Sequence, residues 1–212
     1  MTRGADASSK LEVTSPTGER GRDVPAARSP AWLARSVGIA ATGFSAVYLA
    51  SDLLEIGQGQ FSTLRLALTY AGEAAIPLFV LGLYALQRPR IGRLGLFGAT
   101  AYAYSYVFFA STVVYALVAS APDYQAATKA FGAWMVVHGL IMVIGGVAFG
   151  VAVARARVFP RWTGVCLAVG VVLVAAASGQ STVARTVAEA IAAAALAGMG
   201  WALLRGTARV RR

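Results

Sequence analysis

Long apolar stretches separated by short polar segments dominate the sequence from about residue 31 onward. Six of these stretches come close to the roughly 20 residues that a helix needs to cross the hydrocarbon core of a bilayer. A backbone in lipid must satisfy its own hydrogen bonds, so the pattern predicts an all-α, polytopic membrane bundle. The six predicted transmembrane helices are Trp32–Ala50, Leu66–Gln87, Leu94–Ser120, Ala130–Ala154, Trp162–Gly179 and Thr186–Leu204.

The segments outside this apolar region are polar and charged. Residues 1–30 hold five basic and four acidic side chains among Ser, Pro, Gly and Ala. Too little apolar surface is present there to offset the entropy of ordering, which predicts a disordered cytoplasmic tail. No apolar core follows the initiating Met closely, so we expect no cleavable signal peptide. The transmembrane domain would cover 31–206, and 207–212 would be a basic cytoplasmic tail.

Positive charges near the ends of the predicted spans are unevenly distributed. Twelve arginines fall on the side that holds both termini, the turn at 88–93 and the turn at 155–161, whereas three basic residues fall on the other side. Because Lys and Arg are retained on the cytoplasmic side, this asymmetry predicts that both termini are cytoplasmic. It also favours an even number of spans in the cell membrane.

Composition supports a membrane protein over a soluble one. The chain is 58% hydrophobic and only 13% charged, with a mean hydropathy of +0.64. Its net charge of +10 comes from cations that punctuate apolar segments, whereas a nucleic-acid-binding protein needs them gathered on a solvated face. We therefore expect the lipid bilayer, and not nucleic acid, as its partner. The single Cys166 excludes an intrachain disulfide.

Ionisable residues inside the predicted spans are few and unevenly placed. If each span is centred on the membrane, Glu73, His138, Glu189, Asp52 and Glu55 all fall in the outer half. Burying an ionised acid at membrane depth costs on the order of 2.5–3.5 kcal/mol, so such residues usually face the bundle interior and mark a site. An alternative is that Glu73 stays neutral and bonds a neighbour such as His138, which would contribute about 1 kcal/mol to helix association.

Aromatic residues give a second indication of a site. The segment "YAYSYVFFASTVVY" places Tyr102 and Tyr106 four residues apart on one helical face near mid-membrane, where a phenol needs a hydrogen-bond partner. With Phe109 and Trp134 they are candidates for the wall of a binding cavity, and ordinary core packing is the alternative. No second histidine completes a metal or bis-histidine haem site, so we expect neither a metal nor a cofactor.

Small residues recur along the predicted fourth span. Gly146 and Gly150 have the G-x-x-x-G spacing that lets two membrane helices approach closely. This spacing predicts tight packing against a neighbouring helix and carries no chemistry.

Residues 138–173, "HGLIMVIGGVAFGVAVARARVFPRWTGVCLAVGVVL", resemble a broad class of uncharacterised bacterial integral membrane proteins with a V/L-P-R-W-x-G turn between their later spans. That resemblance implies topology only. Acids on separate spans also make the chain similar to small integral-membrane terpene cyclases of meroterpenoid and indole-sesquiterpene pathways. That second resemblance implies that Glu73, with Glu189 or Asp52, protonates an isoprenoid alkene or epoxide. Seven spans are common in those cyclases, and six are predicted here.

Acid-initiated cyclisation needs a carboxylic acid that stays protonated near neutral pH, which an apolar environment favours. It also needs aromatic faces to stabilise cations and a dry pocket. We expect Glu73 to be the acid and His138 or Asp52 its tuning partner, with a lipophilic ligand. Two non-enzymatic alternatives remain. A proton-coupled carrier would use Glu73 as a proton site and a helix broken at Pro77, and an accessory subunit would use its small-residue faces.

Overall fold

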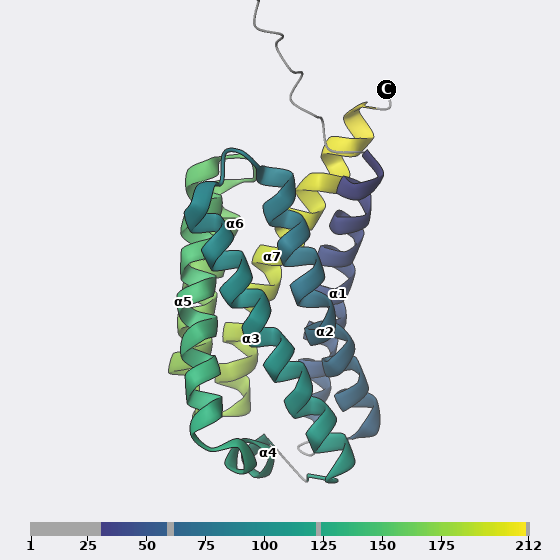
Figure 1. The fold of residues 1–212 in the computed structure, drawn as a ribbon. Helices are drawn as coiled ribbons and strands as arrows, with labels where there is room; N and C mark the ends of the chain where they lie inside the picture. The colour runs from purple at the N-terminus through teal and green to yellow at the C-terminus, as the bar shows by residue number, and fades with distance from the viewer. Residues whose placement is uncertain (1–30, 59–61, 122–123, 211–212) are drawn as a thin grey trace, which may run out of the picture.

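Every regular element in the computed structural model is an α-helix across the described residues, which are 31–58, 62–121 and 124–210. Six long helices stand side by side, and the short helix α4 lies across one end of the bundle (Figure 1). The helices are α1 (Ala31–Gln58), α2 (Thr63–Gln87), α3 (Gly92–Val118), α4 (Tyr124–Phe131), α5 (Ala133–Ala156), α6 (Arg161–Ala176) and α7 (Thr182–Val210).

The six long helices form a closed ring. Each one packs against the helix before it and the helix after it along the chain, and α7 packs back against α1 to complete the circle. Short connections explain why consecutive helices are neighbours, because a short turn can only lead to an adjacent antiparallel helix. Closure of the ring between α1 and α7 joins opposite ends of the chain. The six long helices therefore surround a common central axis.

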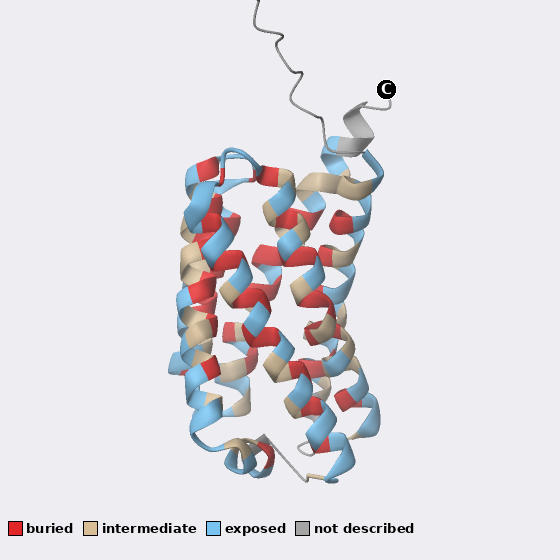
Figure 2. Cartoon of the chain, viewed as in Figure 1, coloured by how far each residue is buried: buried red, intermediate tan, exposed pale blue. Residues whose placement is uncertain are grey.

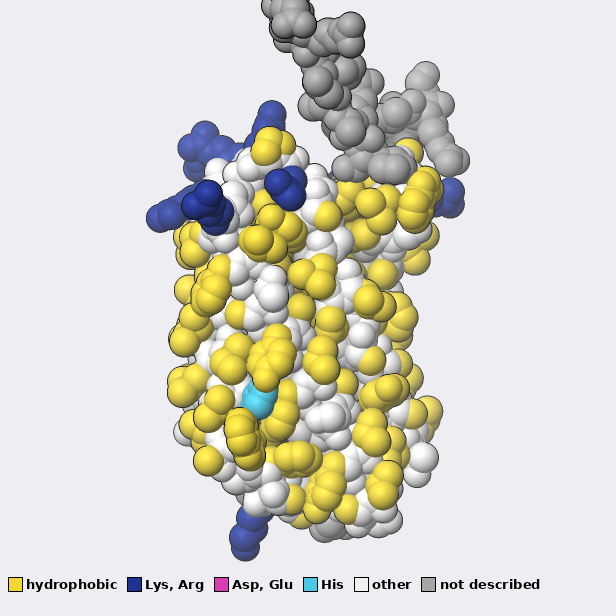
Figure 3. Space-filling view, viewed as in Figure 1, with side chains coloured by type: hydrophobic (Ala, Val, Ile, Leu, Met, Phe, Trp, Pro, Cys, Tyr) yellow, Lys and Arg dark blue, Asp and Glu magenta, His cyan; other side chains and the backbone are white. Residues whose placement is uncertain are grey.

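The two ends of the bundle differ in charge. One end carries the α2–α3 and α5–α6 turns with Arg88, Arg90, Arg93, Arg155 and Arg157, and we refer to it as the Arg-rich end. The first described residues and the end of α7 lie there too (Figure 1). Most lysine and arginine side chains on the visible face lie at this end, while hydrophobic side chains cover the length of the bundle (Figure 3). The other end is the α4 end.

The outer surface of the bundle is apolar, as a lipid environment requires. Buried residues line the interior and the helix interfaces, and the exposed positions lie on the outward faces (Figure 2). Large apolar side chains such as Leu78 and Val118 are among the most exposed. Among the described residues, α1, α2, α3, α5 and α7 are long and apolar enough to cross a membrane. The predicted helical membrane bundle is confirmed at this level, and α6 is a shorter apolar helix of 16 residues.

Several helix boundaries differ from the prediction. Helix α1 continues to Gln58, eight residues beyond the predicted end of the first span. Residues predicted to begin the fourth span at Ala130 belong instead to α4, which ends before Gly132, a residue with a φ of +52° that an L side chain rarely adopts. Helix α7 extends to Val210, past the predicted start of the basic tail at 207. The predicted disordered tail, residues 1–30, lies outside the described residues.

Close glycine contacts draw the helices together in the Arg-rich half of the bundle. A Cβ atom added to Gly150 of α5 would lie 2.5 Å from the carbonyl oxygen of Gly164 in α6, and one added to Gly98 of α3 would lie 2.3 Å from the backbone nitrogen of Phe149. Helices this close leave no room for a side chain between them. The predicted close packing at Gly150 is thus present. Toward the α4 end, by contrast, a Cβ on Gly139 of α5 would meet nothing within 4 Å.

Candidate functional site

A cavity of about 970 Å³ lies inside the ring of helices, away from the glycine contacts of the Arg-rich half. All seven helices contribute side chains to its wall. Its deeper part is lined by apolar residues such as Ile76, Met142 and Leu196. Nearer the α4 end its wall is polar and charged, with Lys129 of α4 among the lining residues. The site therefore has one apolar and one polar end.

Polar residues reach the cavity as short stripes along single helices. The members of each stripe are three or four residues apart, so they lie on one helical face while the remaining faces stay apolar. Three helices carry such stripes: Ser45, Tyr48 and Asp52 on α1; Arg65, Thr69 and Glu73 on α2; and Arg185 and Glu189 on α7.

Glu73 is the most deeply placed acid of the cavity. It lies ten residues into α2, about 15 Å along the helix from its start at the α4 end. Its side chain is 8% exposed, and its Oε2 atom is buried with no hydrogen-bond partner among the described residues. Pro77 lies one turn later on α2 and has no N–H, so the usual helical hydrogen bond to the backbone carbonyl of Glu73 is missing. A buried carboxyl oxygen without a partner costs about 1–3 kcal/mol of stability.

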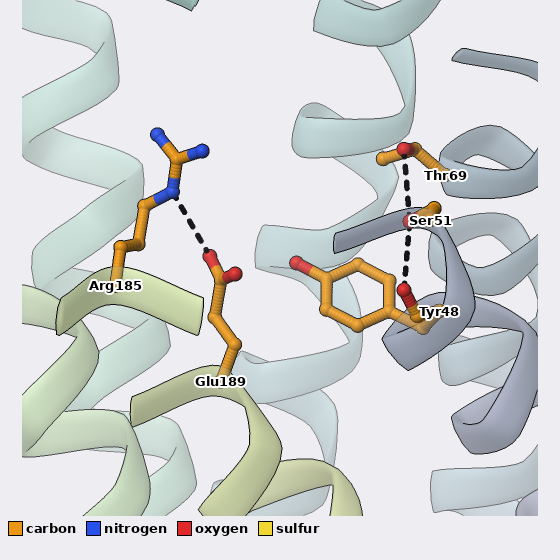
Figure 4. Close-up of polar contacts among 5 residues, drawn as sticks. All are labelled: Tyr48, Ser51, Thr69, Arg185 and Glu189. Carbon is orange, nitrogen blue, oxygen red and sulfur yellow. Dashed lines mark hydrogen bonds and ion pairs between the residues drawn. The ribbon is translucent and has the colours of Figure 1, made fainter. Parts of the chain in front are cut away.

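Glu189 of α7, on the other side of α1 from α2, lines the same cavity. Its Oε1 lies 3.7 Å from the Nε of Arg185, one turn away on α7. Tyr48 of α1 points its phenol toward this pair (Figure 4). The side chains of Glu73 and Glu189 both line the cavity. One acid of the cavity thus has an arginine beside it, while Glu73 lies deeper and has no ion pair in the described structure.

The α1–α2 side of the polar end is held by hydroxyl groups. Thr69 Oγ1 donates to Ser51 Oγ at 3.2 Å, and Ser51 Oγ donates to the backbone carbonyl of Tyr48 at 2.7 Å (Figure 4). Ser45 Oγ, one turn before Tyr48, is buried without a partner among the described residues and lines the cavity. The chain of bonds through Ser51 fixes α1 against α2 at the depth of the cavity.

Tyr102, Tyr106 and Phe109 form an aromatic wall on α3. All three line the cavity, and Tyr102 is almost fully buried. The Tyr102 hydroxyl donates to the Tyr106 hydroxyl at 3.3 Å, with ring centroids 5.0 Å apart in an edge-to-face arrangement. The Tyr106 and Phe109 rings lie 5.8 Å apart. The two phenols therefore find a polar partner in each other at the wall of the cavity.

The predicted roles of His138 and Trp134 do not fit their positions. His138 does not line the cavity. Its ring stacks on Phe108 with centroids 3.7 Å apart, and its Nδ1 lies 2.9 Å from the backbone oxygen of Trp134. Trp134 is 64% exposed and also lies off the cavity wall. His138 is buried within the α3–α5 contact against Phe108, whereas Trp134, one turn earlier on α5, is exposed on the outside of the bundle.

Of the two acids predicted at the end of the first span, Asp52 reaches the cavity. Its side chain is buried and lines the polar end. Glu55, predicted as a binding residue, has a side chain that lies outside the described residues. The structure thus brings Asp52, Glu73 and Glu189 together from three helices, as the concentration of acids in one half of the sequence's spans predicted.

Three cavity residues were not among the sequence-based candidates. Tyr48, Arg65 and Arg185 each line the cavity, and the sequence analysis counted Arg65 and Arg185 only as basic residues on the side away from the termini. Helical spacing could have identified the two arginines. Arg65 precedes Glu73 by eight residues and Arg185 precedes Glu189 by four, so each arginine lies on the same helical face as an acid. Polar residues repeating on one face of an otherwise apolar helix indicate that this face is shielded from lipid.

The side chains that could ligate a metal ion are not clustered in the described residues. Among residues 31–58, 62–121 and 124–210, no group of three His, Cys, Asp or Glu side chains lies close enough to hold a metal ion. A scan against protein-family models and searches of curated proteins and solved structures returned no significant match. The class of protein that the fold and the site define is a helical membrane-type bundle with an internal, acid-containing cavity.

Proposed function

We propose that the protein is an integral membrane protein whose cavity binds a lipophilic isoprenoid and that Glu73 protonates it to start a cyclisation or isomerisation. The observation that carries this proposal is the Glu73 carboxyl group, buried at the wall of a cavity of about 970 Å³ with its Oε2 unbonded. Cavities of this size are at the upper end of those that enclose a small organic ligand.

The proposed reaction needs only an acid to donate a proton and a base to accept one at the end. The Glu73 carboxyl group transfers its proton to an alkene carbon or an epoxide oxygen, and the resulting carbocation is captured by the π electrons of a second alkene in the same molecule. A proton lost from the final cation returns to a carboxylate, either Glu73 itself or Glu189. The product of the alkene route is an isomer of the substrate, so no oxidant or reductant is consumed.

The cavity wall supplies the remaining requirements. The rings of Tyr102, Tyr106 and Phe109 offer electron-rich faces that stabilise a cation by about 0.5–2 kcal/mol each. The apolar lining around Ile76 and Leu196 keeps water from the cation, which would otherwise be captured as an alcohol. A low-dielectric surrounding also favours the uncharged, proton-donating form of a carboxyl group.

The proposed topology is six spans, in which α6 is the short one, with the Arg-rich end in the cytoplasm of the cell membrane. Both ends of the described chain lie at the Arg-rich end (Figure 1). Arginine is retained on the cytoplasmic side of bacterial and other cell membranes, which supports this orientation. The polar end of the cavity would then open in the outer half of the bilayer.

The alternative of interhelical bonding by Glu73 has less support, because its Oε2 makes no hydrogen bond and His138 lies off the cavity. A proton-coupled carrier remains the non-enzymatic alternative. Such carriers bind their solute at interrupted helices, whereas α2 continues through Pro77 as one helix of 25 residues.

The experiment is a turnover assay in vesicles. The purified full-length protein is reconstituted and supplied with linear C15–C20 isoprenoid alcohols, their terminal epoxides and prenylated aromatics, and products of unchanged mass but shorter chromatographic retention are sought. We expect Glu73→Gln to reduce the formation of such isomers at least 100-fold, because the amide cannot donate the proton. His138→Gln, outside the cavity, should retain more than half of the activity.

Three outcomes would contradict the proposal. The first is that no isomer forms with any substrate in the panel. The second is that Glu73→Gln turns substrate over at the rate of the unsubstituted protein. The third is that Glu73→Gln fails only because the protein no longer assembles, which size-exclusion chromatography and helical circular dichroism would show. Proton-linked uptake of a solute that Glu73→Gln abolishes would establish the carrier instead.

A further inference from the structure

The two helices α5 and α6 separate toward the α4 end of the bundle. In the Arg-rich half they touch through Gly150 and Gly164, and a Cβ on Gly146 would lie 2.8 Å from the side chain of Val171. Following the same face of α5 away from that contact, Val143 is half-buried and Leu140 is exposed. The facing side of α6 changes in the same way, from buried Val171 to exposed Ala175.

This separation is a consequence of helix length. Helix α6 has 16 residues and spans about 24 Å, whereas α5 has 24 residues and spans about 36 Å. Both begin their contact at the Arg-rich end, so α6 ends while α5 continues. The first turns of α5, at the α4 end, therefore have no α6 backbone beside them.

The residues left uncovered are also residues of the cavity wall. Val136, Gly139, Leu140 and Val143 of α5 line the cavity, as does Ala175 of α6. Val136 is 64% exposed and Leu140 is 58% exposed, so these side chains contact the cavity and the outside of the bundle at once. The gap between α5 and α6 is thus a lateral opening, lined by apolar side chains, at a depth where the outer surface is apolar.

An apolar depression lies on the outer surface directly below this opening. It has a volume of about 260 Å³ and is lined by Val147 of α5 and by Ala168, Val169, Val172 and Leu173 of α6. The depression follows the same pair of helices, and Val147 is one helical turn from Val143 at the opening. A flexible hydrocarbon chain fits a shallow groove of this composition.

We infer that the ligand reaches the cavity sideways from the bilayer, as an amphiphile with an isoprenoid or acyl chain, through the opening between α5 and α6. Its chain passes Leu140 and Val143 into the apolar end of the cavity, and its polar head turns toward the end that holds Arg65 and Arg185. The inference rests on the lipophilic ligand of the proposed function, but not on proton transfer from Glu73.

Leu140 controls the width of this opening, which allows a test with opposite changes at one position. The full-length protein in phosphatidylcholine–phosphatidylglycerol vesicles is mixed with a C20 isoprenoid alcohol carrying a diazirine. After light flashes at successive times, mass spectrometry measures cross-linking to the peptides that contain Glu73 and Tyr102. We expect Leu140→Trp to slow labelling of these peptides at least fivefold and Leu140→Ala to speed it at least threefold.

Ile144 provides the matched control. It lies one turn from Leu140 on α5 and is 56% exposed, but it does not line the cavity. Ile144→Trp and Ile144→Ala should leave the labelling rate within a factor of two of the unsubstituted protein. A loss of folding cannot produce a faster rate in one Leu140 variant and a slower rate in the other.

The results separate this inference from the proposed function. If the unsubstituted protein labels its cavity peptides but the Leu140 variants label at the same rate, lateral access is wrong while ligand binding stands. If Lys129→Trp, at the α4 end, slows labelling instead, the ligand enters through the polar mouth and lateral access is again wrong. If the cavity peptides are never labelled, both the lipophilic ligand and the lateral route are overturned.

Discussion

Replacing Glu73 with Met should stabilise the folded protein. The side chains have similar length and flexibility, so the change removes the carboxyl group while leaving the cavity wall filled. Oε2 of Glu73 is buried and has no hydrogen-bond partner within the described part of the chain. Removing such an oxygen recovers its desolvation cost of about 1–3 kcal/mol, which lowers the equilibrium constant for unfolding about 5- to 150-fold.

The measurement is reversible unfolding in mixed micelles by increasing mole fraction of sodium dodecyl sulfate, followed by circular dichroism. Glu73→Gln should change the free energy of unfolding by less than about 0.5 kcal/mol, because the amide is as poorly satisfied as the acid. Ile76→Met, in the same wall of α2, measures the effect of a flexible methionine alone and should cost less than about 1.5 kcal/mol.

A loss of about 1 kcal/mol or more in Glu73→Met would refute this reasoning. That sign would mean that the carboxyl group holds helices together, since interhelical polar contacts in membranes contribute about 0.6–2 kcal/mol. A gain in stability, in contrast, would indicate that the acid is kept at a cost to the fold, as functional groups commonly are.

Three further outcomes follow from the packing and the proposed topology. Gly150→Leu should destabilise the bundle by at least about 1–3 kcal/mol in the same unfolding assay, because its side chain would collide with the Gly164 backbone, whereas Gly139→Ala in open space should not lower stability. Ser51→Ala should cost about 0.6–1.5 kcal/mol, since it removes the bonds to Thr69 and Tyr48, while Ser45→Ala should be neutral or stabilising; equal losses in both would contradict the hydrogen-bond assignment. In a Cys166→Ala background, Lys129→Cys should react with an impermeant maleimide on intact cells and Arg157→Cys only after lysis, and the reverse pattern would overturn the proposed orientation.

The local pattern of apolar and polar residues was enough to predict the long helices. Their apolar lengths match a bilayer, and the Arg-rich turns separate them, so the approximate positions of α2 and α3 follow from the sequence alone. The predicted ends of some helices differ from those in the structure. Helix α6 stops at Ala176 rather than Gly179, and the last two residues of α4 were included in the next span, because hydropathy does not mark a turn inside a continuous apolar or mixed stretch.

The acids of the site were predictable because charge in an apolar span is rare and costly. Counting residues from the centre of each predicted span placed Asp52, Glu73 and Glu189 in one half of the bundle, and all three line the cavity. The same counting gave His138 a similar depth but could not give its direction around the helix axis. In the structure that direction is toward Phe108, outside the cavity.

The sequence by itself determined the apolar helices, the charge difference between the two ends and the depth of each ionisable residue, because these depend only on distance along the chain. Only the tertiary structure decided that α7 closes the ring against α1, that glycine contacts narrow the Arg-rich half, and that α6, with 16 residues, ends while the 24-residue α5 beside it continues. Which face each helix turns inward depends on contacts between residues far apart in the chain. Those contacts turn Glu73 inward and leave His138 outside the cavity.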